Sequence, residues 1–275
     1  MCWRVKQSFA LPADDTPLTL LNPRRTAYAW VYVGDRSNPY TVFDLSVGRQ
    51  HEFPDKFLAG YQGYLHADGY AGYNGLNAAG ATHVGCWMPA RRNFFEAKDS
   101  DPVRAHEALA RIRLLYEVEA EAKEQGLGSE ELAACRRERA GPVLMSFADW
   151  LAAEVPRVLP KSKIGEALGY ASNQWPTLVR YVEDGRLAID NGAAEQAIRP
   201  LAVGRRNWLQ IAGDGGLHSA AVLLSIAAST RRHALNPWVY VKQILLESAR
   251  RPASADLSDL LPDNYKRLQA SQLAR

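Results

Sequence analysis

The chain has 275 residues, of which 47% are hydrophobic and 23% charged, with a formal net charge of +3. This balance supports a globular core, and no apolar run reaches the roughly 20 residues of a membrane-spanning helix. The first twelve residues lack the sustained apolar stretch of a signal peptide. The three cysteines are too few, and odd in number, for a disulfide framework, which favours reduced thiols and a cytoplasmic location.

The first hundred residues predict α/β structure. Residues 27–35 and 40–46 are rich in β-branched and aromatic residues and flank the turn-forming GDRSNP, which predicts a hairpin. Short strands are expected at 63–68 and 81–87. Short helices are expected at 51–60, at 69–80 and from Pro89 onward, with proline in the first helical position.

Residues from about 100 to 187 form a block without predicted strands. Apolar side chains recur there at helical spacing, and the segment 124–131 separates two helices. Pro176 is expected to kink or restart a helix after Trp175. The block predicts packed helices, and none of its residues indicates chemistry.

The last part of the chain is also helical. Residues 217–234 and 236–251 predict two helices joined by a short turn, with Asn236 capping the second and Pro237 in its first turn. Between Arg199 and Arg251 there are eight lysines and arginines against two acids, a charge that could meet DNA phosphates. The basic residues also fit an ordinary solvated helical face. The helix pair fits either two packed helices or a helix-turn-helix that reads DNA.

Carboxylates at predicted strand ends suggest a metal site. Asp68 ends the strand at 63–68, and Asp14 and Asp15 follow another possible strand. Glu195 lies on a helical segment much later in the chain. Three converging carboxylates suit hard cations such as Mg²⁺, which relieve their mutual repulsion. Taken singly, the aspartates fit turns, and Glu195 fits an ordinary helical pair with Arg199.

Five stretches follow one another along the chain: ADDTPL (13–18), FLAGYQGYLHADGYAGYNGL (57–76), HVGCWMPARRNFFEA (83–97), EDGRLAIDNGAAEQAIRPLAVGRRNWL (183–209) and LLPDNY (260–265). Together they resemble the central and C-terminal parts of the transposases of the insertion sequence 66 family. The similarity runs from about residue 13 to 265.

The resemblance implies an α/β fold, a mixed-sheet core like that of RNase H with a large all-helical insertion and a helical C-terminal segment. The implied core comprises 1–97 and 188–213, the insertion 98–187 and the C-terminal segment 214–275. The resemblance also implies an acidic triad of Asp14, Asp68 and Glu195 that binds Mg²⁺, with Mn²⁺ as an alternative. Whether Asp14 or Asp15 is the first member of the triad stays open.

The implied activity is metal-dependent cleavage and strand transfer of DNA, in which water or a DNA 3′-hydroxyl attacks a phosphodiester. The implied partners are the ends of the element and target DNA, with a homo-oligomer assembled on DNA and no membrane. Five arginines are expected to contact the DNA backbone: Arg91, Arg92, Arg199, Arg205 and Arg206.

Three hypotheses remain open from the sequence. The first is an active transposase catalytic region, in a full-length or a truncated copy. The second is a catalytically inactive DNA-binding or inhibitory remnant of a transposase. The third is an unrelated α/β protein whose carboxylates only cap turns. His83 and Cys86 are spaced like two zinc ligands, but two ligands do not make a tetrahedral site, so both are expected in a strand or core.

Overall fold

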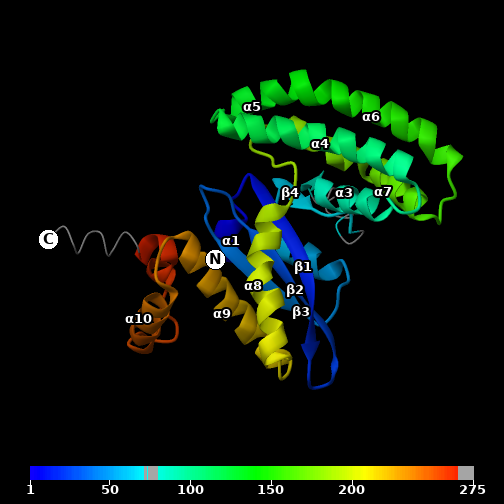
Figure 1. Cartoon of the computed structure of the whole chain (residues 1–275). Helices are drawn as coiled ribbons and strands as arrows, with labels where there is room; N and C mark the ends of the chain where they lie inside the picture. The colour runs from blue at the N-terminus through cyan, green and yellow to red at the C-terminus, as the bar shows by residue number, and fades with distance from the viewer. Residues whose placement is uncertain (71–72, 74–79, 266–275) are drawn as a thin grey trace. The chain divides into compact units, whose positions relative to one another are not determined.

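The computed structural model describes residues 1–70, 73 and 80–265 (Figure 1). These residues form two compact units. Unit 1 comprises residues 1–63, 75–81 and 192–275, and unit 2 comprises residues 64–74 and 82–191. The expected α/β class is confirmed, whereas the expected three-part domain division stays a prediction. The described helices include none that is long and apolar enough to cross a membrane.

Unit 1 is built on three antiparallel strands. They are β1 (Ala10–Leu20), β2 (Arg25–Val33) and β3 (Thr41–Ser46), and the expected hairpin is β2–β3. The β1 strand is longer than its sequence suggested, and its pairing with β2 begins at Ala13, one residue beyond Pro12, which has no backbone donor. The short helices α1 (Cys2–Val5) and α2 (Glu52–Leu58) complete the N-terminal part of the unit.

Two long helices pack in unit 1 with one face of these strands. These are α8 (Gly192–Trp208) and α9 (Asp214–Arg232). The helices share one apolar core with the strands. The strands contribute alternate residues that point to the same side, and the helices contribute residues of their inner faces. The core residues are Leu18, Leu20, Ala27, Ala29, Val31, Val33 and Phe43 of the strands, and Ala194, Ile198, Leu201 and Leu217 of the helices.

Serine side chains of α9 bind the edge strand. The Ser225 hydroxyl accepts from the backbone N–H of Phe43 at 2.8 Å, and the Ser229 hydroxyl accepts from Thr41 at 3.0 Å. Because these hydroxyls satisfy backbone groups that β3 leaves unpaired, α9 also protects an edge that would otherwise pair with another chain.

The C-terminal helix α10 (Pro237–Ala249) begins as expected, since the Asn236 side chain accepts from the N–H groups of Trp238 and Val239. A short 3₁₀ turn, η6 (Ser258–Leu260), follows it. Asp263 then accepts from the Tyr40 hydroxyl at 2.5 Å and pairs with Arg4 at 3.1 Å. These contacts fix the LLPDNY stretch to the N-terminal part of unit 1.

Unit 2 contains the two short strands expected from the sequence, β4 (Tyr64–Ala67) and β5 (Thr82–Gly85), and the structure pairs them in parallel. Most of the helix predicted at 69–80 lies outside the described residues. The helix predicted from Pro89 begins two residues earlier, at Trp87, so proline occupies its third position. Pro176 lies inside its helix, which continues to Leu178 before a 3₁₀ turn. The helix therefore does not restart after Trp175, and the kink expected as the alternative stays a prediction.

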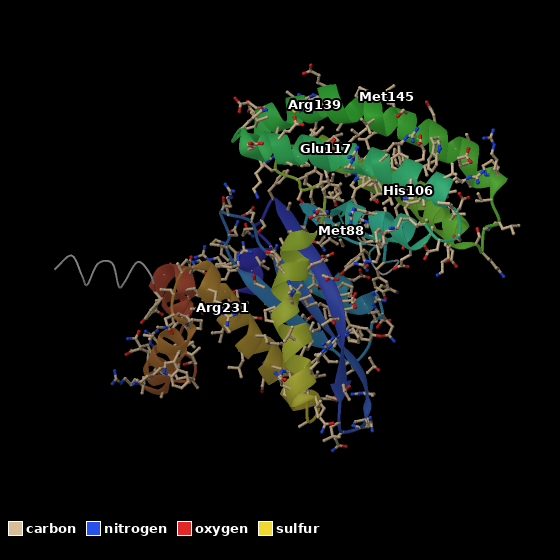
Figure 2. All side chains as sticks on the ribbon, viewed as in Figure 1. Met88, His106, Glu117, Arg139, Met145 and Arg231 are labelled. Carbon is tan, nitrogen blue, oxygen red and sulfur yellow. The ribbon has the colours of Figure 1, made fainter. Side chains whose placement is uncertain are left out.

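The remaining helices of unit 2 form the expected helical block. Its elements are α3 (Trp87–Glu96), α4 (Pro102–Glu124), α5 (Ser129–Cys135), the π-helix η3 (Arg136–Ala140), α6 (Gly141–Glu154), η4 (Val155–Arg157), α7 (Lys163–Leu178) and η5 (Val179–Val182). Charged side chains occupy the solvent side, and Glu117 of α4, for example, pairs with Arg113 at 3.5 Å (Figure 2).

Aromatic rings and one buried arginine hold this block together. Phe147 stacks with or meets Trp87, Trp150 and Trp175 at centroid distances of 5.5–5.9 Å. Arg136 is 1% exposed and binds both carboxylate oxygens of Glu119 at 2.7 Å. It also donates to three backbone carbonyls, those of Tyr181, Asp184 and Leu187. This buried charge is therefore fully paired, as burial requires.

Candidate active site

Asp14 lies on the face of the unit 1 strands that α8 covers. It stands opposite Val31 of β2, which stands opposite Phe43 of β3, and both apolar residues belong to the core shared with α8. Because side chains alternate along a strand, Asp14 points to the same side as Leu18 and Leu20. Its side chain is partly exposed at the border of this core.

Asp15 points to the opposite face, where an arginine neutralises it. Its register neighbours are Trp30 and, beyond that, Asp44. Arg49 donates from Nε at 3.0 Å and from Nη2 at 3.0 Å to the two carboxylate oxygens, a bidentate pair. The Asp15 side chain is only 6% exposed, and the Arg49 guanidinium also lies 5.9 Å from the ring centre of Tyr28. The two adjacent aspartates therefore have different surroundings.

Glu195 occupies the first turn of α8, on the flank of its buried face. Ala194 and Ile198 are buried against the strands, and Glu195 follows Ala194 by one residue, or about 100° around the helix. Its side chain is partly exposed, and that of Arg199, one turn later, is exposed. In the part of the chain that the structure describes, no ion pair joins Glu195 to Arg199, so the carboxylate is not committed to that arginine.

Arg205 fixes the position of α8 along β1. Its Nη1 donates to the Thr16 hydroxyl at 2.7 Å and to the Pro17 carbonyl at 2.6 Å. Farther along, the N–H of Ile211 binds the carbonyl of Thr19 at 2.9 Å, so helix and strand run in the same direction.

Glu195 precedes Arg205 by ten residues, which is about 15 Å of helix and corresponds to four or five strand residues. This spacing puts Glu195 beside the part of β1 around Asp14. The two residues thus belong to the same face and the same end of unit 1, in which α8 packs against β1 (Figure 1).

Asp68 belongs to unit 2, directly after β4. Its Oδ1 accepts from the N–H of Tyr70 at 3.0 Å, which fixes the turn that follows the strand. Burial, followed by the negative charge of Asp68, raises the pKa of Tyr170 to about 12. Burial lowers the pKa of His83, and Asp68 opposes that shift. Because Asp68 lies in one unit and Asp14 and Glu195 in the other, the convergence of the three carboxylates stays a prediction.

Several polar groups missed by the sequence analysis surround this end of unit 2. Burial lowers the pKa of His66 to about 4, and Asp190 partly opposes the shift. Burial also raises the pKa of the Tyr116 hydroxyl, with Asp190 adding to it. The N–H of Asn191 binds the Cys86 sulfur at 3.2 Å. The sequence signals for this cluster were indirect, because His66, Cys86 and Asp190 lie inside the stretches quoted for the family resemblance, with no spacing that joins them.

Arg91 and Arg92, two of the predicted DNA contacts, lie on α3 near the same cluster. Both side chains are exposed. The charge of Arg92 acts on Tyr170 and that of Arg91 on Tyr116, in each case lowering the tyrosine pKa against the dominant effect of burial. Positive side chains thus border the side of unit 2 that carries Asp68.

The predicted metal ligands fit a hard cation by their chemistry, since all three are carboxylates. Among residues 1–70, 73 and 80–265, however, no three His, Cys, Asp or Glu side chains are grouped so that they could hold a metal ion. His83 and Cys86 are both buried, as expected of strand or core residues. The described arrangement therefore supplies the right donor atoms without a complete ligand set.

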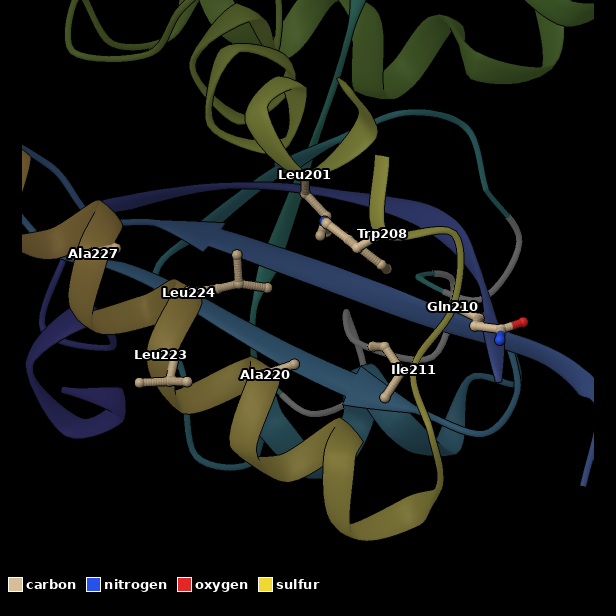
Figure 3. A pocket seen from close by; sticks show the side chains of 8 residues that line it. All are labelled: Leu201, Trp208, Gln210, Ile211, Ala220, Leu223, Leu224 and Ala227. Atoms are coloured by element: carbon tan, nitrogen blue, oxygen red, sulfur yellow. The ribbon is translucent and has the colours of Figure 1, made fainter. Parts of the chain in front are cut away.

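An apolar pocket also occurs in unit 1, between the C-terminal end of α8 and α9 (Figure 3). It is lined mainly by hydrophobic side chains, including Leu201, Trp208, Leu223 and Leu224. Its lining contains no carboxylate, and it begins beyond the first turns of α8 that carry Glu195. It is thus a different feature from the candidate active site.

Comparison with known proteins identifies the family. The family described as "Transposase IS66 family" matches residues 1–219. Three relatives from Sinorhizobium fredii, the uncharacterized proteins y4hP, y4qI and y4jD, are 31%, 28% and 25% identical over 95%, 96% and 95% of this chain. The chain spans 51–55% of the length of these relatives. The chain belongs to the IS66 family of transposases.

Proposed function

We propose that this chain acts as the catalytic region of an insertion-sequence transposase, which cleaves DNA strands and joins them to a target with the help of divalent cations. The observation that carries the proposal is the placement of Asp14 and Glu195 on one face and at one end of unit 1, in a chain of this family. Three antiparallel strands followed by two parallel strands also accord with a core like that of RNase H.

Asp14, rather than Asp15, is the first member of the proposed triad. Asp15 is nearly buried and neutralised by Arg49, so a cation would have to displace an arginine to reach it. Asp14 stands on the same face as the helix of Glu195. The alternation of the strand therefore favours Asp14 in our proposal.

Asp14, Asp68 and Glu195 would hold Mg²⁺, or Mn²⁺, through carboxylate oxygens. The bound cations would activate water or a DNA 3′-hydroxyl and stabilise the leaving oxygen. The protein contributes the rigid placement of the carboxylates: Asp14 by strand pairing, Glu195 by the Arg205 contacts of α8, and Asp68 by its own turn.

The exposed arginines would bind DNA phosphates. Arg91 and Arg92 border the Asp68 side of unit 2, and Arg199 and Arg206 are exposed on α8. Arg205 differs because its guanidinium already binds Thr16 and Pro17, so its main role in our proposal is to position α8. Phosphate contacts of this kind give affinity and salt dependence, not sequence choice.

The test is nicking of supercoiled plasmid by the purified chain with Mg²⁺ or Mn²⁺. Asp14→Asn, Asp68→Asn and Glu195→Gln should each lower the nicking rate at least a hundredfold. Glu117→Gln, which alters an exposed carboxylate on α4, should leave it unchanged. Nicking that survives Glu195→Gln would refute the proposed chemistry.

The inactive-remnant hypothesis predicts a different result in the same experiment. The wild-type chain would bind DNA in a salt-sensitive way without nicking it. Neither the metal nor Glu195→Gln would then change the affinity. The two hypotheses are therefore separated by one set of samples.

A further inference from the structure

The chain passes from unit 2 into α8 through a short buried segment. Ile189 and Asn191 are 6% and 3% exposed, and α8 begins at Gly192, where unit 1 resumes. Glu195 follows Asn191 by only four residues, which span at most about 14 Å even when fully extended. The way in which unit 2 holds this segment therefore limits where Glu195 can lie.

Two hydrogen bonds join this segment to the residues directly after β5. The N–H of Trp87 donates to the Ile189 carbonyl at 3.3 Å, and the N–H of Asn191 donates to the Cys86 sulfur at 3.2 Å. We call Cys86, Trp87, Ile189 and Asn191 the junction clamp. One of its two bonds depends on a side chain, so a substitution at Cys86 can remove that bond without changing the backbone.

The part of the clamp next to β5 is itself held in place by the end of α7. The indole Nε1 of Trp87 donates to the Leu178 carbonyl at 2.9 Å. A Cβ at Gly85 would lie 2.7 Å from the Thr177 hydroxyl oxygen and 3.1 Å from the Leu178 nitrogen, so glycine is what allows α7 to approach this closely. Cys86 lies between these two fixed residues and is 1% exposed. Its sulfur is therefore an acceptor with a fixed position.

The middle residue of the segment provides a separate attachment. Burial, followed by the charge of Asp190, raises the pKa of Tyr116, so the Asp190 carboxylate lies near α4. With this attachment and the Trp87 bond, the segment should stay in place when the Cys86 sulfur is removed. The effect of that removal should then be confined to Asn191 and the residues that follow it.

We propose that Cys86 is a positioning residue for Glu195: by accepting from Asn191, its sulfur fixes the residue from which α8 starts. The inference rests on the proposed function, in which Glu195 and Asp68 bind the same cations. Arg205 holds α8 about 15 Å beyond Glu195, so the first turn of the helix has to be fixed by other contacts. Removing an outer contact that orients a metal ligand typically costs about tenfold to a hundredfold in metal affinity or activity.

Amide hydrogen exchange of the full chain, without DNA or metal, tests the contact itself. In Cys86→Ala, exchange at residues 191–196 should be at least ten times faster than in the wild type, because the first turn of α8 loses its anchor. Cys86→Ser keeps an acceptor at this position and should restore most of the protection. Cys135→Ala changes a cysteine on α5 of the same unit and should exchange as the wild type does.

Exchange in α9 separates a local effect from general unfolding. The rates there should be the same in all four proteins. Unchanged exchange at residues 191–196 in Cys86→Ala would overturn the proposal. Faster exchange throughout α9 would overturn it as well, because the thiol would then support the fold as a whole.

The metal dependence of nicking tests the positioning role. Cys86→Ala should raise the Mg²⁺ concentration for half-maximal nicking about tenfold to a hundredfold, and Cys86→Ser should bring it back close to the wild-type value. DNA affinity measured without metal should be the same for all three proteins. A thiol that only supports the fold would instead lower the nicking rate equally at every Mg²⁺ concentration, and that result contradicts the proposal.

The two experiments separate this inference from the proposed function. A wild type that does not nick DNA would refute the proposed function, and the exchange rates would still decide whether Cys86 fixes the start of α8. Unchanged exchange in Cys86→Ala would end the positioning role even in a chain that nicks.

Discussion

The strongest test of the proposed site compares the adjacent residues Asp14 and Asp15. Strand alternation gives them opposite faces, so one should serve catalysis and the other stability. Asp14→Asn keeps the shape of the side chain and removes a charge at the border of the α8 core. It should abolish metal-dependent nicking and leave the melting temperature nearly unchanged.

Asp15→Asn should do the reverse. The substitution weakens the bidentate pair with Arg49, whose hydrogen bonds to a charged group contribute about 1.5–3 kcal/mol. Arg49 is 41% exposed, so water can hydrate the guanidinium that loses its partner, and the loss should be about 1–2 kcal/mol. In a chain of this size that lowers the melting temperature by roughly 2–6 °C.

The assay pairs plasmid nicking with thermal melts followed by circular dichroism on the same samples. Arg49→Ala serves as the matched control, because it breaks the same pair from the other side. It should lower the melting temperature by a similar amount and still allow nicking. If Asp15→Asn abolishes nicking at full stability while Asp14→Asn remains active, the assignment of faces is wrong.

Three further outcomes follow from particular contacts. Arg205→Ala should lower the free energy of unfolding by about 1–3 kcal/mol in urea titrations, because the hydrogen bonds of Arg205 tie α8 to β1. Arg206→Ala changes the exposed neighbour and should leave the free energy of unfolding unchanged. It should reduce the slope of log DNA affinity against log salt concentration by about one. Burial lowers the pKa of His66 to about 4, so the unfolded chain takes up a proton near pH 6.5 and the folded chain only near pH 4. The free energy of unfolding should therefore fall by up to about 3 kcal/mol as the pH drops through that window. Denaturation curves measured at several pH values should show this fall, and His66→Gln should flatten it. Phe147→Ala should lower stability by about 3–5 kcal/mol, since its ring meets three tryptophans in the core of unit 2, and tryptophan fluorescence should report the loss while Met145→Ala, at a side chain 72% exposed, changes little.

Local patterns predicted the elements well where one pattern dominates. The hairpin at 27–46 is evident because β-branched residues flank a turn, and the capped start of α10 is evident because Asn-Pro precedes an apolar helix. The start of α3 was misplaced because proline is tolerated through the first turn of a helix, so it does not mark one exact position. Pro176 does not restart its helix, which continues only two residues beyond it.

The roles of individual site residues depended on contacts that no local pattern contains. Arg205 and Arg206 are indistinguishable in sequence, yet only Arg205 reaches Thr16, 189 positions earlier in the chain. Asp14 and Asp15 are equally ambiguous until the strand register assigns each a face. In both pairs the side chains are neighbours along the chain and point in different directions, about 100° apart on a helix and about 180° apart on a strand.

That geometry explains why the family's arginines and carboxylates cannot be assigned to DNA or metal as a group. A charged side chain with buried partners is already held by the fold, as Arg205, Arg136 and Asp15 are. A charge directed toward solvent, as at Arg206, is available to a ligand that arrives later. The Arg49 pair holds Asp15 on one face of the strand, and the proposed chemistry uses Asp14 on the other, which is why the paired substitutions there bear most directly on the proposed function.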